Sequence, residues 1–303
     1  MALSSCGSVA DRQGRELTVH GTSLFPIACY RDDFAVDTVP WHWHDELEFI
    51  IVDTGTAVVA VDGENYLIGQ GDGCLINGKA LHSVWPADTD TCRLHSAVFH
   101  PRLVGGSMES IFWQKYLQPF LSDAACRCIC FDSAVSWNQK ALRIMEDTWQ
   151  TCVKEPPGYE FAVRSTLSEL MYLLTEHRSA IQKSPLEKFL REAERIKTML
   201  QYIQDHYGEA LTIAQIAQSA AISESECLRC FRSMIGSTPI QYVKQLRVHR
   251  AAQLLLSTDQ KIADIGAACG FQEMSYFART FRQLKGVTPS EYRNQAEAKP
   301  VGS

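Results

Sequence analysis

Ile213-Ala214-Gln215-Ile216-Ala217 returns further along the chain as Ile262-Ala263-Asp264-Ile265-Gly266. A second motif follows each of these in the same order, because Arg229-Cys230-Phe231-Arg232 returns 50 residues later as Arg279-Thr280-Phe281-Arg282. An internal repeat of this kind indicates that one supersecondary unit occurs twice. The region 211–293 therefore predicts two copies of one folded module.

Each copy has the pattern of a helix, a tight turn and a second helix. Residues 213–217 place apolar side chains at helical spacing, and Ser223 with Glu226 has the pattern of a capping box that opens the second helix. Gly270 provides the backbone freedom that a sharp turn needs in the second copy. Ala221 stands at the corresponding position of the first copy, where it must keep a negative φ or adopt a left-handed conformation at a modest cost. We expect two helix-turn-helix modules.

The second helix of each module has an apolar face and a polar face. Cys227 and Phe231, like Phe277 and Phe281, are four residues apart and are expected to face inward. The opposite faces carry arginine and small side chains, which suit a helix in the major groove because arginine bonds guanine bidentately and serine adapts to several base edges. The residues expected to read bases are Ser225, Leu228, Arg229, Ser275, Ala278 and Arg279.

Arg232 and Arg282 each follow the buried phenylalanine by one residue. We expect them to contact phosphates, which fix the register of a protein on DNA without reading its sequence. The alternative for any one of these arginines is a solvated surface residue. The repeat favours DNA, because a long apolar helix over 240–256 can hold two equivalent helices at successive major-groove segments, about 34 Å apart.

The spacing of these motifs resembles the DNA-binding domain of the AraC family of transcriptional regulators. The resemblance implies a regulator that binds specific double-stranded DNA, responds to a small-molecule effector, forms a homodimer and is not an enzyme. RNA polymerase is a further candidate partner. The matching positions are Leu246-Arg247, Arg250-Ala251, Leu254-Leu255-Leu256, Ile262-Ala263-Asp264-Ile265, Gly270-Phe271, Ser275-Tyr276-Phe277, Phe281 and Gly286-Val287-Thr288-Pro289-Ser290-Glu291-Tyr292-Arg293.

The charge is divided unevenly along the chain. The net charge of −6 would argue against a nucleic-acid partner, but residues 191–293 carry 13 Lys+Arg against 10 Asp+Glu, a net charge of +3. Residues 1–190 carry 15 Lys+Arg against 24 Asp+Glu, a net charge of −9. The asymmetry is typical of a basic DNA-reading domain joined to an acidic body that does not touch DNA.

Nothing in the sequence indicates export or a membrane anchor. The first 20 residues include four charged side chains, and no stretch has the roughly 18 consecutive apolar residues of a membrane span. We therefore expect a cytoplasmic protein whose 11 cysteines are reduced and mostly buried. Cys126, Cys128 and Cys130 alternate, which favours one face of a strand over a metal cluster, since the spacing matches no standard zinc pattern.

The region from Phe25 to His100 has the signals of an antiparallel β-barrel, with short apolar runs separated by turn residues. Asp62-Gly63 predicts a two-residue hairpin turn. Within this region His42-x-His44-x-x-x-Glu48 resembles the first signature of the cupin superfamily, and Gly71 through His82 resembles the second. The second signature is only partly kept, because Asn77 stands where proline is usual and Lys79 where glycine is usual.

His42, His44 and Glu48 share parity along an extended segment, so they are expected to project to one side of a sheet and to meet His82. We favour an organic-ligand pocket at this cluster, with no required cofactor. A divalent metal is the alternative occupant, because three imidazoles and one carboxylate suit iron, manganese, nickel or zinc. The rival function is a metal-dependent cupin enzyme with an accessory DNA-binding domain. A third alternative is a barrel that binds nothing and serves as a dimerisation scaffold.

The remaining segments complete an α+β architecture. Two amphipathic helices are expected at 136–154 and 159–178, either packed on the barrel or supplying the homodimer interface that the family resemblance implies. Ser179 to Pro185 is a polar connector, and we place the domain boundary there. The predicted fold is a cupin-like β-barrel with packed helices, followed by an all-α domain of two helix-turn-helix units joined by a linker helix. The expected divisions are 1–105, the ligand-sensing barrel; 106–184, the helical dimerisation segment with linker; 185–294, the DNA-binding domain; and 295–303, a tail.

Overall fold

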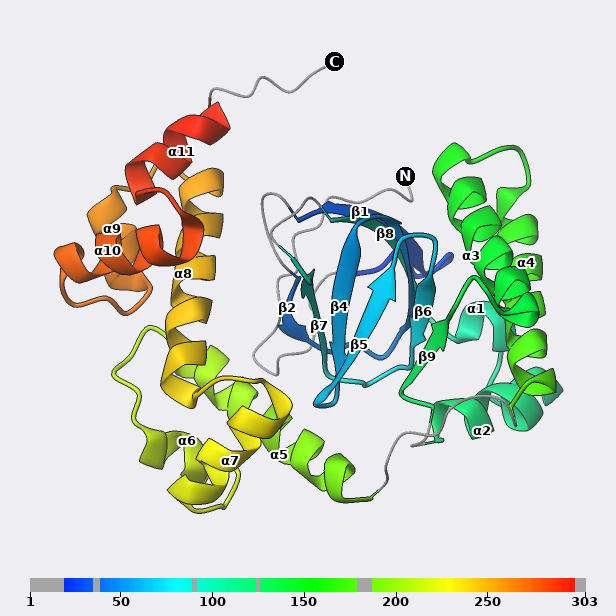
Figure 1. The fold of residues 1–303 in the computed structure, drawn as a ribbon, viewed down its shortest axis with the longest axis horizontal. Coiled ribbons are helices and arrows are strands. Elements are labelled where there is room, and N and C mark those ends of the chain that lie inside the picture. Colours follow the sequence, from blue (N-terminus) through cyan, green and yellow to red (C-terminus); the bar gives the residue numbers. More distant parts are fainter. Residues whose placement is uncertain (1–18, 35–38, 89–91, 124–125, 179–186, 298–303) are drawn as a thin grey trace. The chain divides into compact units, whose positions relative to one another are not determined.

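The computed structural model describes residues 19–34, 39–88, 92–123, 126–178 and 187–297, with side chains at 187–190 and 295–297 left undescribed. The chain divides into two compact units, Met1–Ala193 and Glu194–Ser303 (Figure 1). The division falls within helix α5 (Glu187–His206). The connector expected at 179–185 lies outside the described residues.

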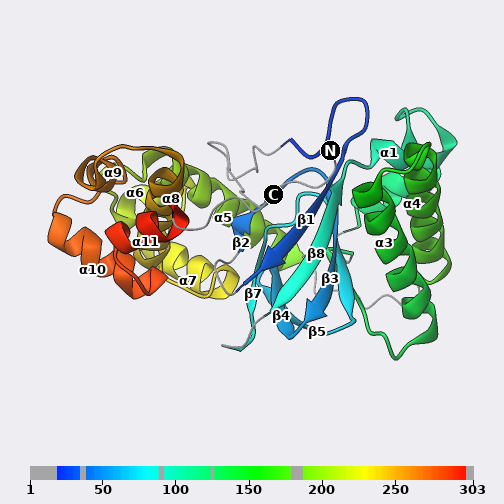
Figure 2. The same ribbon diagram turned by 90° about the horizontal axis from the view of Figure 1, so that it is seen from above.

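The first unit is built on two antiparallel sheets. The larger sheet has the strand order β1-β8-β3-β6-β9, and the smaller has the order β2-β7-β4-β5. Figure 2 shows β1, β8 and β3 side by side in the larger sheet. Val61 and Glu64 pair across the Asp62-Gly63 turn, so the predicted hairpin of β4 and β5 is confirmed. The strands are β1 (Ile27–Asp33), β2 (Val39–His42), β3 (Leu47–Thr54), β4 (Thr56–Val61), β5 (Glu64–Gly69), β6 (Gly73–Ile76), β7 (His82–Pro86), β8 (Arg93–Phe99) and β9 (Cys128–Phe131).

Alternation along the strands creates two apolar layers. On β3, Ile50 and Val52 face the other sheet and join a core formed by both sheets. Leu47, Phe49 and Ile51 face the opposite way, into a second core that includes the helices. This alternation places Glu48 on the side that faces the other sheet, because side chains two residues apart share a face.

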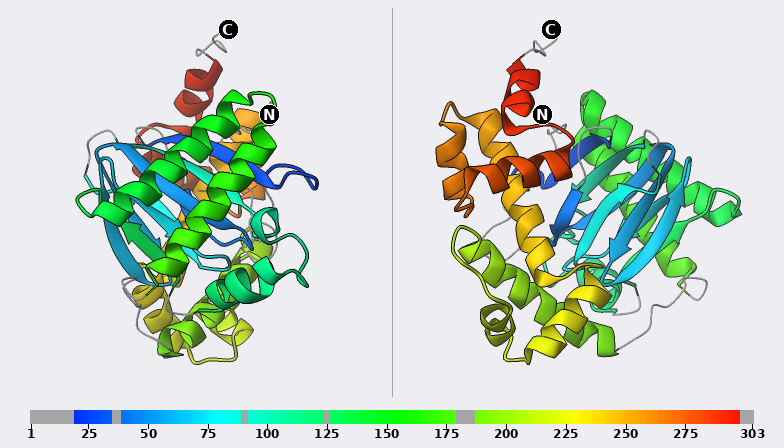
Figure 3. Two further views of the ribbon diagram at one scale, coloured as in Figure 1. Left: turned by 90° about the vertical axis from the view of Figure 1, so that its right-hand side faces the viewer. Right: turned by 60° about the vertical axis from the view of Figure 1, so that its left-hand side comes forward.

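Two long helices cover the outer face of the larger sheet. These are α3 (Ser136–Lys154) and α4 (Tyr159–Glu176), which lie side by side against it (Figure 3). The indole N–H of Trp149 on α3 donates a hydrogen bond to the Tyr30 carbonyl of β1, 3.2 Å away, and so attaches the helix to the sheet. Both helices were predicted from their periodicity, and both are confirmed. Shorter helical segments precede them: α1 (Arg102–Gly105), the π-helix η1 (Trp113–Leu117) and α2 (Gln118–Leu121).

The second unit is entirely helical within its described residues and contains the predicted duplication. One module is formed by α6 (Ile213–Ser219) and α7 (Glu224–Met234), and the other by α9 (Ile262–Ala268) and α10 (Met274–Lys285). The long helix α8 (Pro239–Ser257) joins them, as Figure 3 shows. The last helix, α11 (Pro289–Glu297), extends three residues into the stretch expected to be a tail. The predicted fold class is confirmed.

The two turns are equivalent in hydrogen bonding but differ in residue type. The Ile222 N–H donates to the Ala217 carbonyl, and the Phe271 N–H donates to the Gly266 carbonyl. Gly270 has a φ of 81°, and Ala221 has a φ of 53°, so the alanine adopts the left-handed conformation. The predicted capping box of Ser223 and Glu226 is present. Sequence reasoning therefore located both turns correctly.

None of the helices among the described residues is long and apolar enough to cross a membrane.

Candidate functional site

The second helix of each module exposes the face that was predicted to read DNA. On α7, Ser225, Arg229 and Arg232 are exposed and Leu228 is half-buried, and together they line a shallow groove. On α10 the same positions hold exposed Ser275, Arg279 and Arg282 and half-buried Ala278. The predicted inward residues Cys227, Phe231, Phe277 and Phe281 are fully buried. Each helix therefore presents one basic face to solvent and packs through the other.

A groove of the second unit continues the α10 face onto the linker helix. Its lining includes Lys244 of α8 together with Ser275, Tyr276 and Arg279 of α10. The Lys244 ammonium lies 5.7 Å from the centre of the Tyr276 ring, and the Arg279 guanidinium lies 5.6 Å from it. A hydrogen bond from Lys244 lowers the pKa of the Tyr276 hydroxyl. The sequence named Tyr276 only as a position of the family motif and did not single out Lys244, because their proximity depends on how α8 and α10 pack.

Two other arginines of the family motifs are structural. Arg247 donates hydrogen bonds to the carbonyls of Tyr207 and Glu209, at 2.7 and 2.6 Å. Arg293 donates to the carbonyls of Leu255 and Gln260, at 3.3 and 2.8 Å. Their guanidinium groups satisfy main-chain acceptors of the unit. The arginines that α7 and α10 expose are Arg229, Arg232, Arg279 and Arg282.

The four residues of the cupin-like signature converge in the first unit. Candidate ligand atoms of His42, His44, Glu48 and His82 all lie within 4.8 Å of one another. The expectation that His42, His44 and Glu48 lie on one extended segment is wrong. His42 ends β2, the chain then turns through His44, and Glu48 lies on β3 of the other sheet. The residues meet because the chain crosses from one sheet to the other between them.

Each imidazole of this His-Glu cluster is held by a main-chain carbonyl. The Nδ1 atoms of His42, His44 and His82 lie 2.8, 3.0 and 2.9 Å from the carbonyl oxygens of Pro40, Glu46 and Ala80, respectively. A carbonyl can only accept, so each Nδ1 carries the proton while the imidazole is neutral. In that tautomer Nε2 carries the lone pair, and it can donate a hydrogen bond to a carboxylate only when the imidazole is protonated.

The Nε2 atoms of two histidines point at one carboxylate oxygen. Oε2 of Glu48 lies 3.1 Å from Nε2 of His82 and 3.5 Å from Nε2 of His44. Burial alone would raise the pKa of Glu48, but hydrogen bonds and charge from His44 and His82 outweigh burial and hold it well below its usual range. Nε2 of His44 is buried, and at 3.5 Å from Oε2 of Glu48 it lies at the distance limit for a hydrogen bond. A buried nitrogen with so weak a contact is suited to a ligand.

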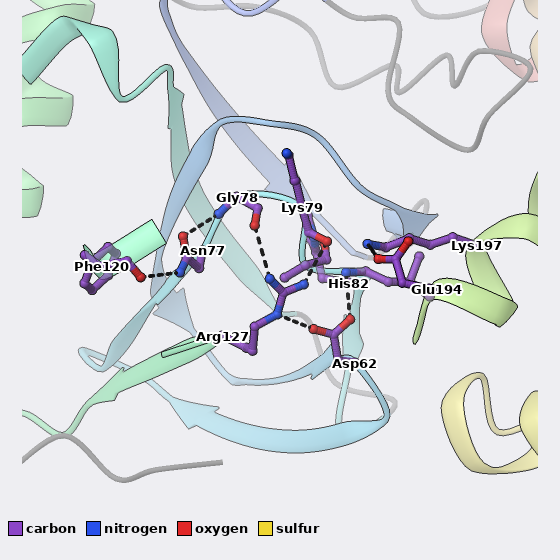
Figure 4. Close-up of polar contacts among 11 residues, drawn as sticks. Asp62, Asn77, Gly78, Lys79, His82, Phe120, Arg127, Glu194 and Lys197 are labelled. Carbon is purple, nitrogen blue, oxygen red and sulfur yellow. Dashed lines mark hydrogen bonds and ion pairs between the residues drawn. The ribbon is translucent and has the colours of Figure 1, made fainter. Parts of the chain in front are cut away.

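The turn that precedes His82 is fixed by one arginine. The Arg127 guanidinium forms an ion pair with Asp62, with 2.6 Å between Nε and Oδ2, and donates to the carbonyls of Gly78 and Lys79 (Figure 4). Asp62 also accepts a hydrogen bond from the Leu81 N–H at 3.0 Å. Lys79 has a φ of 64°, which explains why glycine is usual at this position. Arg127 therefore stabilises a turn in which Lys79, a residue other than glycine, adopts a strained left-handed conformation.

His20 is a further histidine beside the cluster that sequence reasoning missed. Its ring centre lies 5.3 Å from that of His44, and its Nδ1 lies 2.7 Å from the Tyr30 hydroxyl. Both side chains are buried. No motif marks His20, since it lies 24 positions before His44 and reaches the site only through the pairing of β1.

The donor set fits a divalent metal ion. Three imidazoles, which bind a metal through an unprotonated nitrogen, and one carboxylate are suitable ligands for first-row transition metals. The carbonyl acceptors at Nδ1 are the outer contacts that orient metal-bound histidines. The same groups would also hydrogen-bond a polar organic ligand, so the geometry fits both predicted occupants.

Comparison with known proteins identifies both units. A family model described as an AraC-like ligand binding domain matches residues 24–136, and one described as a helix-turn-helix domain matches residues 216–295. The chain is 27% identical over 288 residues to the HTH-type transcriptional regulator YdeC of Bacillus subtilis, covering 94% of this chain and 97% of that protein. It is 25% identical over 263 residues to the HTH-type transcriptional activator RhaS of an Enterobacter species, covering 86% of this chain and 89% of that protein.

A solved structure is similar to part of the chain. It is a transcriptional regulator with an AraC-type DNA-binding domain from Chromobacterium violaceum, 33% identical, with a TM-score of 0.34, covering 35% of this chain and 95% of that one.

The fold and the family matches define a class: a DNA-binding transcription regulator that joins a ligand-binding β domain to tandem helix-turn-helix modules. The chain belongs to the AraC family of transcriptional regulators.

Proposed function

We propose that α7 and α10 read a specific DNA sequence and that a small molecule bound beside the His-Glu cluster controls this binding. The observation that supports the proposal best is the exposure of equivalent serine and arginine side chains on the two recognition helices, above fully buried phenylalanines. Arg229 and Arg279 would read bases together with Ser225 and Ser275. Arg232 and Arg282 would contact phosphates.

Alanine substitutions separate these two roles. Replacing Arg229 or Arg279 with alanine should weaken binding to the selected operator by about 1–3 kcal/mol and relax its preference at one or two base pairs. Replacing Arg232 or Arg282 should weaken binding to all sequences alike and reduce the salt dependence by about one phosphate contact. The measurement is fluorescence anisotropy with operator and scrambled duplexes over a series of salt concentrations.

Arg164→Ala is the matched control, because this arginine is exposed on α4 of the first unit. It should leave both the affinity and the salt slope unchanged. If Arg229→Ala and Arg279→Ala each left operator affinity unaltered, these residues would be removed from the DNA interface. Equal losses on operator and scrambled DNA would reassign them to phosphate contacts.

A divalent metal is a second candidate occupant of the barrel, favoured by the weakly paired, buried Nε2 of His44. His42, His44, Glu48 and His82 would hold it, and the ion would supply a Lewis acid that polarises an oxygen atom of the effector. Titrating the metal-free protein with zinc or manganese should show one site by calorimetry. His44→Ala should abolish it, whereas His177→Ala, at the end of α4, should not. Absence of binding by the unsubstituted protein would exclude the metal, leaving an organic ligand or a barrel that binds nothing.

We propose that the protein is a regulator and not an enzyme, since the relatives that it matches over most of their length are named as regulators. The rival is a metal-dependent cupin enzyme with an accessory DNA-binding domain, and the His-Glu cluster is the observation in its favour. Metal that alters operator affinity supports a sensor. Metal-dependent oxygen consumption with a candidate organic acid supports the enzyme.

We further propose that the protein acts in the cytoplasm, where its DNA is, and that it forms a homodimer. The support for a dimer is an exposed apolar surface on the helical layer of the first unit. Phe161 and Tyr172 lie three helical turns apart on one face of α4 and are 84% and 57% exposed. Ile111 and Phe112, just before η1, are also exposed, and η1 packs against α4. RNA polymerase is a further candidate partner, supported by the RhaS relative's name as an activator.

A further inference from the structure

Three cysteines that neither proposed site uses are brought together on one face of the larger sheet. Cys74 of β6 lies directly opposite Cys130 of β9 in the antiparallel register, and Cys128 lies two residues before Cys130. Residues directly opposite each other share a face, as do residues two apart on a strand. The three side chains therefore project in the same direction.

The thiols of this trio are in contact and differ in exposure. The Cys128 thiol forms hydrogen bonds with Cys130 and with Cys74. Cys74 and Cys128 are buried in the core between the sheets, whereas Cys130 is exposed. Strand β9 is at the end of the sheet order, with β6 its partner there. The exposed Cys130 thiol at the edge of the sheet therefore lies beside the buried thiols of Cys74 and Cys128.

The environment of Cys130 favours its reactive form. The hydrogen bond from Cys128 stabilises the thiolate and lowers the pKa of Cys130, against the opposing effect of burial. For Cys128, its contacts with Cys130 and Cys74 raise the pKa well above the usual value. The thiolate is the nucleophilic form of cysteine, and a thiol that oxidises selectively combines thiolate character with exposure.

We propose that Cys130 is a hydroperoxide-reactive thiol and that Cys74 resolves its oxidised form to a disulfide across β6 and β9. Cα atoms of directly opposite residues on antiparallel strands are about 4.5–5.5 Å apart, within the range of about 4.4–6.8 Å that disulfides span. Cα atoms two residues apart along a strand are about 6.6 Å apart, at the limit of that range. The cross-strand pair therefore needs less movement of the backbone than Cys128 with Cys130.

The reaction balances with hydrogen peroxide as the oxidant. The Cys130 thiolate attacks one peroxide oxygen, an S–O bond forms, the O–O bond breaks, and the departing hydroxide takes a proton to become water. The Cys74 sulfur then attacks the sulfenic acid of Cys130, an S–S bond forms, and the S–O bond breaks. The hydroxide that leaves takes the Cys74 proton as a second water. Two thiols lose two electrons in all, and the peroxide gains them.

The test treats the full-length protein with equimolar hydrogen peroxide, blocks free thiols, and maps disulfides by mass spectrometry of tryptic peptides. Cys74 lies in the peptide 32–79, and Cys128 and Cys130 lie in 128–140. A linked pair of these peptides is the expected product. A single 128–140 peptide that is two hydrogens lighter would show a Cys128–Cys130 disulfide and overturn the assignment of Cys74.

Substitutions at three cysteines test the disulfide independently, in case one of them disturbs folding. Cys130→Ser should abolish the linked peptides, and Cys74→Ala should let the Cys130 sulfenic acid accumulate, so that dimedone traps it. Cys126→Ala is the matched control, because Cys126 is buried in the helical-side core instead; it should leave the linked peptides unchanged. Unmodified Cys130 after treatment, or equal oxidation in Cys130→Ser, would overturn the proposal.

Discussion

At the residue scale, the two helix-turn-helix turns show how one backbone shape accepts two residue types. Ala221 and Gly270 both have a positive φ, yet their surroundings differ. A Cβ atom built on Gly270 would lie 2.6 Å from the Tyr207 carbonyl oxygen and 3.0 Å from the Arg247 guanidinium. Glycine at 270 is thus required by both conformation and space, whereas alanine at 221 is accommodated at an energetic cost.

Ala221→Gly should stabilise the second unit. Relief of the left-handed alanine contributes about 1–2 kcal/mol, and the greater freedom of glycine in the unfolded chain opposes it by about 0.4–1 kcal/mol. The expected net gain is between about 0 and 1.6 kcal/mol. Urea unfolding followed by far-ultraviolet circular dichroism measures it, because all six tryptophans lie between positions 41 and 149, outside this unit.

Gly270→Ala is the matched counterpart in the second module. It should lower the stability of the same unit by more than about 2 kcal/mol, since a left-handed alanine is added to a steric overlap with main-chain oxygen. If Ala221→Gly and Gly270→Ala changed the free energy of unfolding in the same direction, the two turns would not be equivalent, despite their matching hydrogen bonds.

At the scale of elements, Arg127 connects segments that are distant in sequence. Its guanidinium joins the β4–β5 turn at Asp62 to the turn at 78–79, from a position just before β9. Both charged groups are largely buried, at 14% and 9% exposure. Removing one member of such a pair leaves the other as an uncompensated buried charge, which is strongly destabilising.

Arg127→Met should lower the free energy of unfolding of the first unit by about 3–5 kcal/mol. Tryptophan fluorescence during urea unfolding reports it. The control is Arg178→Met, which removes a more exposed ion pair to Asp123 with a comparable distance of 2.7 Å. That variant should lose no more than about 1 kcal/mol. Equal losses would mean that burial does not set the strength of the Arg127 contact.

Helices and hairpins could be predicted where the sequence pattern that specifies them is local. Periodicity gave α3, α4 and the paired helices of both modules, and turn residues such as Asp62-Gly63 gave the hairpins. The parity argument for His42, His44 and Glu48 failed because it assumed one strand, while the chain changes sheets there. Arg127 and His20 were missed because their contacts join positions far apart in sequence. Such contacts follow from tertiary packing, and no motif or periodicity in the sequence indicates them.

At the scale of the whole molecule, the exposed apolar side chains of α4 allow the proposed homodimer to be tested. Phe161→Glu should weaken homodimerisation about tenfold to a hundredfold, because fully burying a phenylalanine contributes about 1.5–3 kcal/mol and 1.4 kcal/mol corresponds to a factor of ten. Sedimentation velocity over a range of concentrations measures this. Leu67→Glu, at another exposed apolar residue on β5, should leave association unchanged. A wild-type protein that remains monomeric at all concentrations would exclude the α4 interface.

The duplicated modules are similar without being interchangeable. The half-buried position between serine and arginine is Leu228 in one recognition helix and Ala278 in the other, and Lys244 and Tyr276 flank the second alone. If α7 and α10 read DNA as proposed, a single protomer has two different ends along the double helix, and reversing the operator presents each module with the wrong base pairs. We expect each binding site to have a direction, so that inverting it in front of a promoter would turn the bound protein to face away from the start of transcription.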